Sequence, residues 1–384
     1  MAGLPLLEDL PDVAGRKVLV RADFNVPLRW PDGPDGAAVV ADDFRILAAM
    51  PTLDWLRNRG AEVTVCSHLG RPEGQADLRY DMSPVRTRLA ELAPGVALMD
   101  NLRFHPGEKT NDPAFVNRLV EGFDSYVNDA FGVSHRRHAS IVGPPALLPS
   151  AAGRLLAREV EAVGGLLAHP ARPFVAVVGG AKVTDKLGVV RSLLDTVDTV
   201  IVGGGMAFTF LAAQGHSVGQ SLFDAKAVPL CRALLDEAGD RVLLPTDVVV
   251  RRIIAGGEEE ISVMGADVPD DAVGLDIGPT TAAIFAAAVA DAGTVFWNGP
   301  MGVFEDPRFS AGTYAVAEAI AASGAFSVVG GGDSVAALDQ LGLEGKVSFV
   351  STGGGAALEL LEYGDLPGLD ALRHASNAAG PAGC

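Results

Sequence analysis

Short apolar stretches that end in glycine or in a polar cluster recur along the whole chain. They span residues 17–20, 62–66, 96–99 and 125–127 in the first half, and 174–178, 199–202, 242–244, 273–277, 294–297, 326–329 and 347–350 in the second. Such runs of valine, isoleucine and leucine are typical of strands buried on both faces of a parallel sheet. Stretches rich in alanine, leucine and arginine, such as 84–92 and 314–323, lie between them. The alternation predicts βαβ units and an α/β protein.

The length of 384 residues exceeds that of one ordinary core and favours two domains. We expect two doubly wound, Rossmann-like parallel-sheet domains, residues 1–168 and 169–365, with a cleft between them. Residues 151–168 carry apolar side chains at helical spacing and are followed by Pro170 and Pro173. This segment predicts a helix that bridges the two domains.

The composition argues against several classes of protein. The net charge is −18 and no block is rich in lysine or arginine, which argues against a nucleic-acid partner. No apolar run reaches the ~18 residues of a membrane span, and residues 1–12 lack the apolar stretch of a secretory signal. Cys66, Cys231 and Cys384 are far apart and odd in number, so we expect free thiols in a reducing cytoplasm.

The charge is unevenly distributed between the two halves. The net charge is −4 for residues 1–168 and −14 for residues 169–384. The first half is therefore the better candidate to bind an anion through side chains. The second half must use backbone dipoles, a few lysines or a metal ion if it binds phosphates.

Polar residues follow four predicted strands of the first half, in the segments 21–25, 67–72, 101–105 and 128–138, and Arg45 opens the first crossover helix. Open α/β sheets bind ligands at the carboxyl ends of their strands. One crevice is therefore expected to collect Asp23, Asn25, Arg45, His68, Arg71, Arg103 and Arg136. Guanidinium groups match phosphate and carboxylate bidentately, which indicates a small, multiply charged, hydroxylated anion. Each arginine taken alone fits an ordinary surface residue equally well, and His105 and His138 fit structural roles better.

Glycine clusters follow four strands of the second half, at 179–180, 203–205, 330–332 and 353–355. Glycine lets the backbone approach a ligand, and the helix start behind it offers free N–H groups to phosphate. One such cluster fits tight strand-to-helix packing, but four in one domain favour a nucleotide. Neither a P-loop motif nor a complete G-x-G-x-x-G occurs, so P-loop enzymes and dinucleotide-dependent dehydrogenases lose support.

Three further features of the second half suit a nucleotide. Lys182 and Lys186, four residues apart on one helix face, are candidate phosphate ligands. Asp333, which follows three glycines, is the candidate Mg²⁺ carboxylate. The segment 298–305 offers an apolar wall and a carboxylate for a ribose, although by itself it is equally compatible with a rigid turn.

Nine motifs, in their order and spacing, resemble those of phosphoglycerate kinases over nearly the whole chain. They are RADFNVPL (21–28), SHLGRP (67–72), NLRFHPGE (101–108), NDAFGVSHRRHAS (128–140), GGAKVTDK (179–186), GGGMAFTF (203–210), WNGPMGVFE (297–305), GGGDS (330–334) and STGGGA (351–356). The resemblance implies reversible transfer of the acyl phosphoryl group of 1,3-bisphosphoglycerate to Mg-ADP, giving 3-phosphoglycerate and ATP, after hinge closure of the domains.

The resemblance also implies residue roles. The residues that would hold 3-phosphoglycerate are Asp23, Phe24, Asn25, Arg45, His68, Leu69, Gly70, Arg71, Arg103 and Arg136. Those that would hold ADP or ATP are Gly180, Ala181, Lys186, Gly204, Asn298, Pro300, Val303, Glu305, Gly331, Gly332, Asp333 and Ser334, with Asp333 also at Mg²⁺. The groups that would act on the transferred phosphoryl group are Arg45, Lys182 and the backbone at Gly332 and Gly355.

The same resemblance implies that residues 366–384 pack back on the first domain. We further expect a cytoplasmic monomer with neither a membrane nor a nucleic-acid partner. Two rival classes remain at this point: another two-domain kinase that acts on a carboxylate, and a non-catalytic binding protein that closes around an anion.

Overall fold

The computed structural model describes residues 3–31, 33, 36–184 and 186–378. Contacts within the chain divide it into two units, Met1–Glu161 together with Asp365–Cys384, and Ala162–Gly364. The boundary falls inside helix α6 (Arg154–Ala168), seven residues earlier than the predicted end of the first domain at residue 168. Hereafter these are the first unit and the second unit.

The first unit is built on a five-stranded parallel sheet of order β5-β4-β1-β6-β7. Its strands are β1 (Lys17–Arg21), β4 (Glu62–Cys66), β5 (Ala97–Leu98), β6 (Ser125–Asn128) and β7 (Ser150–Ala152). A small antiparallel hairpin joins β2 (Leu28–Arg29) to β3 (Val39–Val40). The helices are α1 (Phe44–Arg57), α2 (Ser83–Leu92), α3 (Gly107–Thr110), α4 (Pro113–Val120), α5 (Ala139–Val142), the first part of α6, and α14 (Pro367–Ala378).

The two faces of this sheet bury different helices because successive strand residues point to opposite sides. Val18 and Val20 of β1 pack in one cluster with Leu53 of α1 and Val85 of α2. Leu19, between the two valines, packs in the opposite cluster with residues that include Leu119 of α4 and Tyr126 of β6. Strands covered on both faces read as continuous apolar runs, which explains why the sequence pattern locates them.

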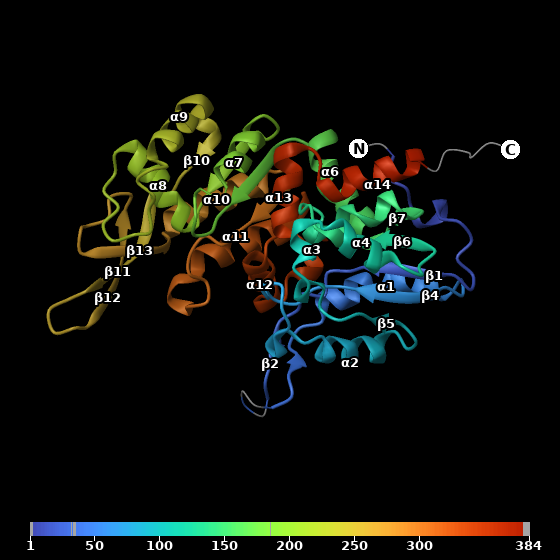
Figure 1. Ribbon diagram of the computed structural model, residues 1–384. Helices are drawn as coiled ribbons and strands as arrows, with labels where there is room; N and C mark the ends of the chain where they lie inside the picture. Colours follow the sequence, from blue (N-terminus) through green and yellow to red (C-terminus); the bar gives the residue numbers. More distant parts are fainter. Residues whose placement is uncertain (1–2, 32, 34–35, 185, 379–384) are drawn as a thin grey trace. The chain divides into compact units, whose positions relative to one another are not determined.

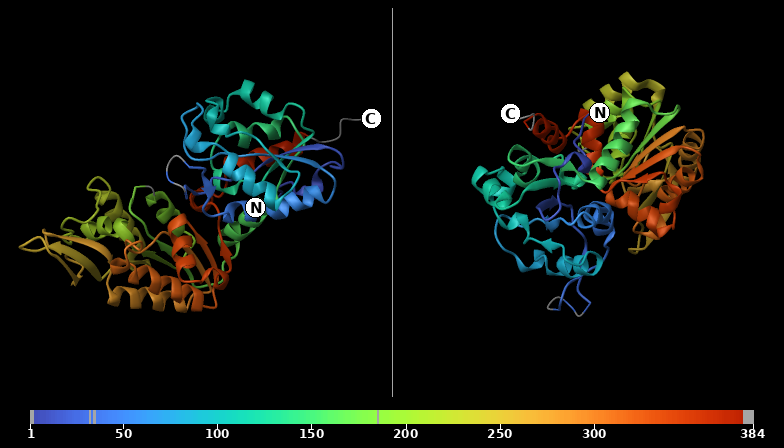
Figure 2. Two further views of the ribbon diagram at one scale, coloured as in Figure 1. Left: turned by 90° about the horizontal axis from the view of Figure 1, so that it is seen from below. Right: turned by 90° about the vertical axis from the view of Figure 1, so that its right-hand side faces the viewer.

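The second unit contains a six-stranded parallel sheet of order β10-β9-β8-β14-β15-β16. Its strands are β8 (Phe174–Val178), β9 (Thr199–Val202), β10 (Val242–Leu243), β14 (Thr294–Asn298), β15 (Phe326–Gly330) and β16 (Phe349–Val350). Helices α10 (Pro279–Ala290), α11 (Ala311–Ala322) and α12 (Gly332–Gln340) cover one face, as Figure 2 shows in orange and red, and share a core with Val175, Val295 and Trp297. The remaining helices are α7 (Leu187–Leu194), α8 (Gly204–Gln214), α9 (Val228–Ala238) and α13 (Gly354–Tyr363).

A third sheet was not predicted. It is antiparallel, of order β12-β11-β13, and comprises β11 (Asp247–Ile253), β12 (Glu259–Gly265) and β13 (Ala272–Ile277) (Figure 1). Residues 273–277 were expected in the parallel sheet, and this expectation is wrong because β13 pairs antiparallel with β11. Phe208 and Leu211 of α8 pack under the small sheet.

The predicted helix over residues 151–168 also needs correction. Ala151 and Ala152 belong to β7, which pairs with β6, and α6 begins only at Arg154. The Asp129 carboxylate, just after β6, accepts hydrogen bonds from the N–H groups of Leu155 (2.9 Å) and Leu156 (3.2 Å) and so caps the helix. A cap supplied from a distant strand leaves no local sequence signal.

The C-terminal helix α14 packs against α5, β7 and the 3₁₀ helix Pro144–Ala146, all in the first unit. The Gly368 N–H donates to the Ser134 carbonyl at 2.8 Å, and a Cβ at Gly368 would lie 2.9 Å from Ile141. Cys66 and Cys231 are buried free thiols, and Cys384 lies outside the described residues. Among the described helices, none combines the length and apolar character that a bilayer crossing requires.

Candidate functional site

The carboxyl ends of β1, β4 and β6 carry most of the predicted acid-binding residues. The chain fills the sheet outward from β1 in one direction through β4 and β5, and then in the other through β6 and β7. The carboxyl ends of β1 and β6 therefore flank a topological switch point, the place where open α/β sheets bind ligands. The Asp129 N–H donates to the Arg21 carbonyl at 2.8 Å, which ties the segments after these two strands together.

The buried Asp23 and His68 and the half-buried Arg45 form a compact group at this switch point. The Asp23 carboxylate accepts a hydrogen bond from Arg45 and lies 3.6 Å from Nδ1 of His68. Burial raises the pKa of Asp23, but the Arg45 guanidinium, with neighbouring charges, outweighs it and holds the pKa below its usual range. Oδ1 of Asp23 has no hydrogen-bond partner among the described residues although it is buried. A buried acceptor of this kind suits a hydroxyl donor on a ligand.

A second set of hydrogen bonds holds the loop after β4 in place. The Asn25 side chain accepts from the Gly70 N–H at 2.8 Å, and Arg103 donates to the Gly70 carbonyl at 2.7 Å. Gly70 has φ +61°, and a Cβ there would collide with the Tyr80 ring, so only glycine fits this turn. Burial and the charges of neighbouring residues, Arg21 foremost and Arg71 included, lower the pKa of Arg103. Basic groups therefore gather at this end of the sheet.

The remaining predicted residues of the first unit differ in exposure. Phe24 and Leu69 are buried, so they can offer a ligand only backbone atoms. Arg71 and Arg136 are exposed. Burial and then the Arg136 charge lower the pKa of His135 to about 4, and the Asp23 charge opposes this effect, so the segment that carries His135 and Arg136 lies near Asp23. Direct or bridged contacts join Asp23, Asn25, Arg45, His68, Gly70 and Arg103. Arg71 and Arg136 are exposed and form no ion pair with another described residue.

A pocket of about 370 Å³ lies in the second unit, between the parallel sheet and the antiparallel sheet. Volumes of this size are usual for small-molecule sites. Seven predicted nucleotide-binding residues line it, namely Gly180, Ala181, Gly204, Pro300, Val303, Glu305 and Asp333. They come from the loops after β8, β9, β14 and β15, and β8 and β14 flank the topological switch point of this sheet.

Lys186 and Asn298 form one unit beside the pocket rather than in its wall. The Lys186 ammonium donates to the carbonyls of Gly179 (2.7 Å) and Asn298 (3.0 Å) and to the Asn298 side-chain oxygen (2.8 Å). The Ser334 hydroxyl is fully buried and accepts from the Gly299 N–H at 2.6 Å. These polar side chains therefore hold the glycine loops against each other.

Two kinds of glycine are present in these loops. Gly204 has φ +65° and a Cβ there would lie 2.6 Å from the Gly180 nitrogen, so the packing of the loops requires glycine. Gly331 has φ +93° and touches Gly354 closely. Gly332 and Gly355, in the first turns of α12 and α13, have ordinary φ values, and a Cβ at either would meet nothing within 4 Å. The fold does not require glycine at Gly332 or Gly355.

Lys182 and Lys186 were expected on one helix face, but both precede α7, which begins at Leu187. Like Glu305, Lys182 and Asp333 are exposed charged residues of this region. Neither forms a hydrogen bond or ion pair with another residue in the described part of the chain. Among the described residues, no group of three or more His, Cys, Asp or Glu is arranged to hold a metal ion. A single carboxylate in the pocket wall nevertheless fits Mg²⁺, which commonly takes one or two carboxylates and completes its shell with phosphate oxygens and water.

The wall of this pocket that faces the glycine loops was not predicted from the sequence. Phe208, Val248, Leu275 and Asp276 line it from α8, β11 and β13. Burial raises the pKa of Asp276 to about 7 although its carboxylate accepts from the N–H groups of Gly312 (2.7 Å) and Ile277 (2.9 Å). The available signal was the Gly256–Gly257 turn between two valine- and isoleucine-containing segments, which is typical of a hairpin.

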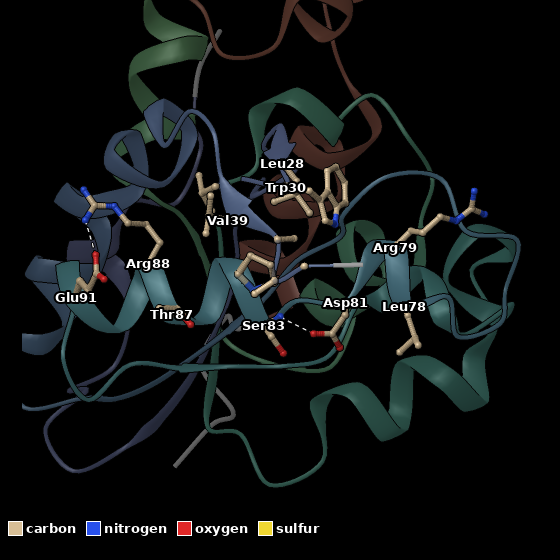
Figure 3. A pocket seen from close by; sticks show the side chains of 15 residues that line it. Leu28, Trp30, Val39, Leu78, Arg79, Asp81, Ser83, Thr87, Arg88 and Glu91 are labelled. Carbon is tan, nitrogen blue, oxygen red and sulfur yellow. Dashed lines mark hydrogen bonds and ion pairs between the residues drawn. The ribbon is translucent and has the colours of Figure 1, made fainter. Parts of the chain in front are cut away.

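A larger pocket of about 760 Å³ lies in the first unit, between the β2–β3 hairpin and α2 (Figure 3). Leu28, Trp30 and Val39 form its upper wall, and Arg88, beside Thr87 of α2, points to Glu91 at 2.6 Å. None of the predicted site residues lines it. The arginines that line this pocket are already paired with carboxylates, so they are poor candidates to bind an anion.

Comparisons with known proteins agree with this arrangement. A family model described as phosphoglycerate kinase matches residues 7–96 and 91–364. Phosphoglycerate kinases of Parafrankia sp. and Rubrobacter xylanophilus are 50% and 49% identical to the chain, covering 95% and 94% of it and 99% and 96% of the relative.

Solved structures agree as well. Phosphoglycerate kinase from Coxiella burnetii has a TM-score of 0.85 at 38% identity, covering 98% of this chain and 100% of that one. The enzyme from Pyrococcus horikoshii has a TM-score of 0.84 at 30% identity, covering 97% and 100%. With two α/β units, a cluster of charged side chains at the end of one sheet and a pocket walled by glycine loops in the other unit, the chain belongs to the phosphoglycerate kinase family and is a phosphotransferase.

Proposed function

We propose that the chain catalyses reversible transfer of the acyl phosphoryl group of 1,3-bisphosphoglycerate to Mg·ADP, giving 3-phosphoglycerate and ATP. The observation that carries the proposal is the pocket of about 370 Å³, whose wall contains seven of the twelve residues expected to bind the nucleotide. A pathway role in glycolysis and gluconeogenesis, and a cytoplasmic monomer, belong to the same proposal. They rest on family membership and are tested by light scattering and by localisation of the tagged chain.

The nucleotide is proposed to bind with its base against the apolar wall that includes Phe208 and Val248, and its ribose beside Val303 and Glu305. Its phosphates lie at the first turns of α12 and α13, where N–H groups and the positive ends of the helices favour anions. Asp333 would hold Mg²⁺, which would supply positive charge that offsets the phosphate charge.

The acid is proposed to bind in the first unit. The orphaned Oδ1 of Asp23 accepts its hydroxyl, and the exposed guanidinium groups of Arg71 and Arg136, with Arg103, bind its phosphate. Arg45, half-buried beside Asp23, is proposed to bind the reacting carboxyl end of the acid. Guanidinium forks bind carboxylate and phosphate oxygens bidentately, which fixes the orientation of the acid as well as its affinity.

The chemical step then needs positioning more than acid–base catalysis. A β-phosphate oxygen of ADP attacks the acyl phosphorus, the bond from phosphorus to the carboxyl oxygen breaks, and its electron pair leaves with the carboxylate of 3-phosphoglycerate. No proton moves. The charge on the phosphoryl oxygens is stabilised by Arg45, Lys182 and the backbone N–H groups at Gly332 and Gly355.

Closure of the two units is part of the proposal. Arg45 belongs to the first unit and Lys182 to the second, and transfer requires reacting atoms ~3–3.5 Å apart. Closure also excludes water, which otherwise hydrolyses the acyl phosphate. We expect a smaller radius of gyration by X-ray scattering with both substrates bound than with either alone. An unchanged radius in the active ternary complex contradicts closure.

The direct test of the function is ADP phosphorylation by 1,3-bisphosphoglycerate, with the purified chain and with Lys182→Ala as the matched inactive control. Turnover by the parent and its loss in the variant support the proposal. Binding of 3-phosphoglycerate without turnover indicates a binding protein instead. Turnover with another acyl phosphate but not with this one indicates a different carboxylate kinase.

A further inference from the structure

Arg21, at the end of β1, is the largest charged side chain in the interior of the first unit, and its solvent exposure is 0%. Because the Arg21 side chain is fully buried, it does not contact a ligand directly. Its guanidinium donates from Nε to the Ser140 hydroxyl at 2.9 Å, from Nη1 to the Ala22 carbonyl, and from Nη2 to Nδ1 of His68 at 3.2 Å. No carboxylate in the described part of the chain lies within ion-pair distance of it.

The contact with His68 fixes where the imidazole carries its proton. A guanidinium group has five N–H donors and no acceptor, so Nδ1 of His68 must be the acceptor in this pair. An imidazole whose Nδ1 accepts carries its proton on Nε2 and is neutral. Nε2 makes no hydrogen bond to another described residue, and the ring is 2% exposed. The N–H on Nε2 is therefore the polar edge that His68 offers to a ligand.

Asp23 competes for the same ring nitrogen. Its Oδ1 lies 3.6 Å from Nδ1 of His68, and an imidazole protonated there would form an ion pair with it. The groups that face His68 are Arg21, Asp23, Arg45 and Arg103. Burial holds the pKa of His68 well below its ordinary value, Asp23 opposes this effect, and the positive charges of the three arginines reinforce it. Geometry and charge therefore favour the same neutral state.

Arg21 is itself held rigidly. The Ser140 hydroxyl that accepts from Arg21 donates to the buried Glu108 carboxylate at 2.7 Å, and Glu108 also accepts the Ser140 N–H at 3.0 Å. The Tyr126 hydroxyl donates to the Ser140 carbonyl at 2.6 Å. The relay Arg21–Ser140–Glu108 compensates the buried cation without a direct ion pair, and leaves Nη2 aimed at His68.

We infer that Arg21 is a positioning residue that keeps His68 as a neutral imidazole protonated at Nε2, so that His68 presents 3-phosphoglycerate with a hydrogen-bond donor rather than a charge. The identity of the ligand rests on the proposed function, whereas the protonation state of the ring does not. The affinity for the acid then depends little on the titration of His68 near neutral pH.

The protonation state of the His68 imidazole is tested first, in the absence of any ligand. In ¹⁵N-labelled protein between about pH 6 and 8, the His68 signals, assigned by their loss in His68→Gln, should show an unprotonated Nδ1 and a protonated Nε2. In Arg21→Met, Nδ1 loses its donor and should gain a proton beside Asp23. Arg79→Ala removes an exposed arginine that is paired with Asp77 and has no part in this relay, and it should leave the ring as in the parent. A protonated Nδ1 in the parent overturns the inference even if no variant folds.

Binding of 3-phosphoglycerate by calorimetry is the second arm. His68→Gln keeps an N–H donor near the position of Nε2, and should bind within about tenfold of the parent, whereas His68→Asn, whose amide lies near Nδ1, should lose roughly 10- to 100-fold. The affinity of Arg21→Met relative to that of the parent should vary with pH, because His68 takes up a proton in the variant and not in the parent. The titration of the ligand affects both proteins equally and cancels in the ratio. Equal losses in His68→Gln and His68→Asn, or a ratio independent of pH, contradict the inference. If the parent itself fails to bind the acid, the proposed function falls while the assignment of the ring stands.

Discussion

The two units carry different chemical groups at the carboxyl ends of their parallel sheets, where we propose that anions bind. In the first unit the site consists of charged side chains, and Asp23, Arg45, His68 and Arg103 are held in place by one another. In the second unit the site consists largely of backbone, with glycine loops packed on one another and Lys186 bound to carbonyl groups. The net charges of −4 for residues 1–168 and −14 for residues 169–384 agree with this difference, since the second half of the chain has few cations that can bind phosphate.

The difference has a physical reason. A small acid is recognised by its charges and hydroxyl, so buried, oriented side chains give specificity. A nucleotide brings its own metal ion and a large base, so it needs a shaped apolar wall and close backbone approach more than charge. The two regions should therefore respond differently to the same kind of substitution.

The largest effect is expected at Lys182. Its exposed ammonium forms no ion pair with another described residue, so its charge is available to the transferred phosphoryl group. Lys182→Ala should lower turnover by about 10²-fold or more while the dissociation constants of both substrates change much less. Steady-state kinetics with calorimetry measures both, and Lys226→Ala, an exposed lysine of the same unit, is the control. Full turnover in Lys182→Ala would rule out this role.

Asp333→Ala should change the affinity for one of the two ligands and not for the other. Because its carboxylate is proposed to hold Mg²⁺, Asp333→Ala should weaken Mg·ADP by roughly 10- to 100-fold or more and leave 3-phosphoglycerate nearly unchanged. Calorimetry with each ligand alone decides between this and misfolding. Equal weakening of both ligands means that the variant is damaged as a whole.

The opposite separation is expected at the exposed arginines of the first unit. Arg71→Ala and Arg136→Ala should each weaken 3-phosphoglycerate by roughly 1.5–3 kcal/mol, the range for hydrogen bonds to charged groups, and leave Mg·ADP unaffected. Arg79, equally exposed but paired with Asp77, supplies the control Arg79→Ala. Parent-like affinity for the acid in both variants would show that these arginines are ordinary surface residues.

The glycines test whether the second site is made of backbone. Gly332→Ala and Gly355→Ala add a methyl group that meets no other atom of the chain, so stability should hold while turnover falls by about tenfold through contact with the nucleotide. Gly204→Ala should instead destabilise the fold by ~1–3 kcal/mol, because its φ is +65° and its Cβ meets Gly180. Thermal unfolding and kinetics on all three variants distinguish the cases. Undiminished turnover in Gly332→Ala and Gly355→Ala removes these glycines from the site.

The smallest effect on substrate binding is expected at two buried carboxylates that cap helices, where stability rather than affinity should change. Burial raises the pKa of Asp129 and of Asp276 to about 7. Asp129 accepts hydrogen bonds from two N–H groups at the start of α6. Asp276 accepts from the N–H groups of Gly312, at the start of α11, and of Ile277. An acid whose pKa is higher in the folded chain takes up a proton on folding, so its contribution to stability falls as pH rises from about 4 to about 7.

Asp129→Asn and Asp276→Asn keep the accepting oxygen but cannot ionise. Relative to the parent, each should gain stability between pH 5 and pH 8, by a few kcal/mol at most. Denaturant unfolding at both pH values measures the gain. A difference from the parent that does not change with pH contradicts the assignment of these carboxylates.

The parallel strands could be predicted from the sequence because burial on both faces produces unbroken apolar runs. The antiparallel strands could not be read in the same way. Strand β12 is mostly exposed, and its large apolar residues, Ile261, Val263 and Met264, are interrupted by Ser262, so it lacks an apolar run. The apolar wall of the nucleotide pocket was missed with it, since Phe208 and Val248 meet only in the folded chain.

The candidate site was predictable as a set of segments but not as a set of contacts. Sequence position placed Arg21 and Arg71 alike at strand ends, yet Arg21 is fully buried and Arg71 exposed. Sequence position likewise could not distinguish Gly331 from Gly332. The positive φ at residue 331 requires glycine, whereas the backbone at residue 332 accepts other residues. Both distinctions depend on neighbours that are remote in sequence.

Hydrogen exchange with one ligand at a time tests the central claim, that the acid binds by side chains of the first unit and the nucleotide by backbone loops of the second. With 3-phosphoglycerate, protection should rise in the segments 21–25, 67–72, 101–105 and 128–138. With Mg·ADP it should rise in 179–184, 203–208, 298–305 and 330–334. Protection of the second set by the acid, or of the first set by the nucleotide alone, would contradict the account.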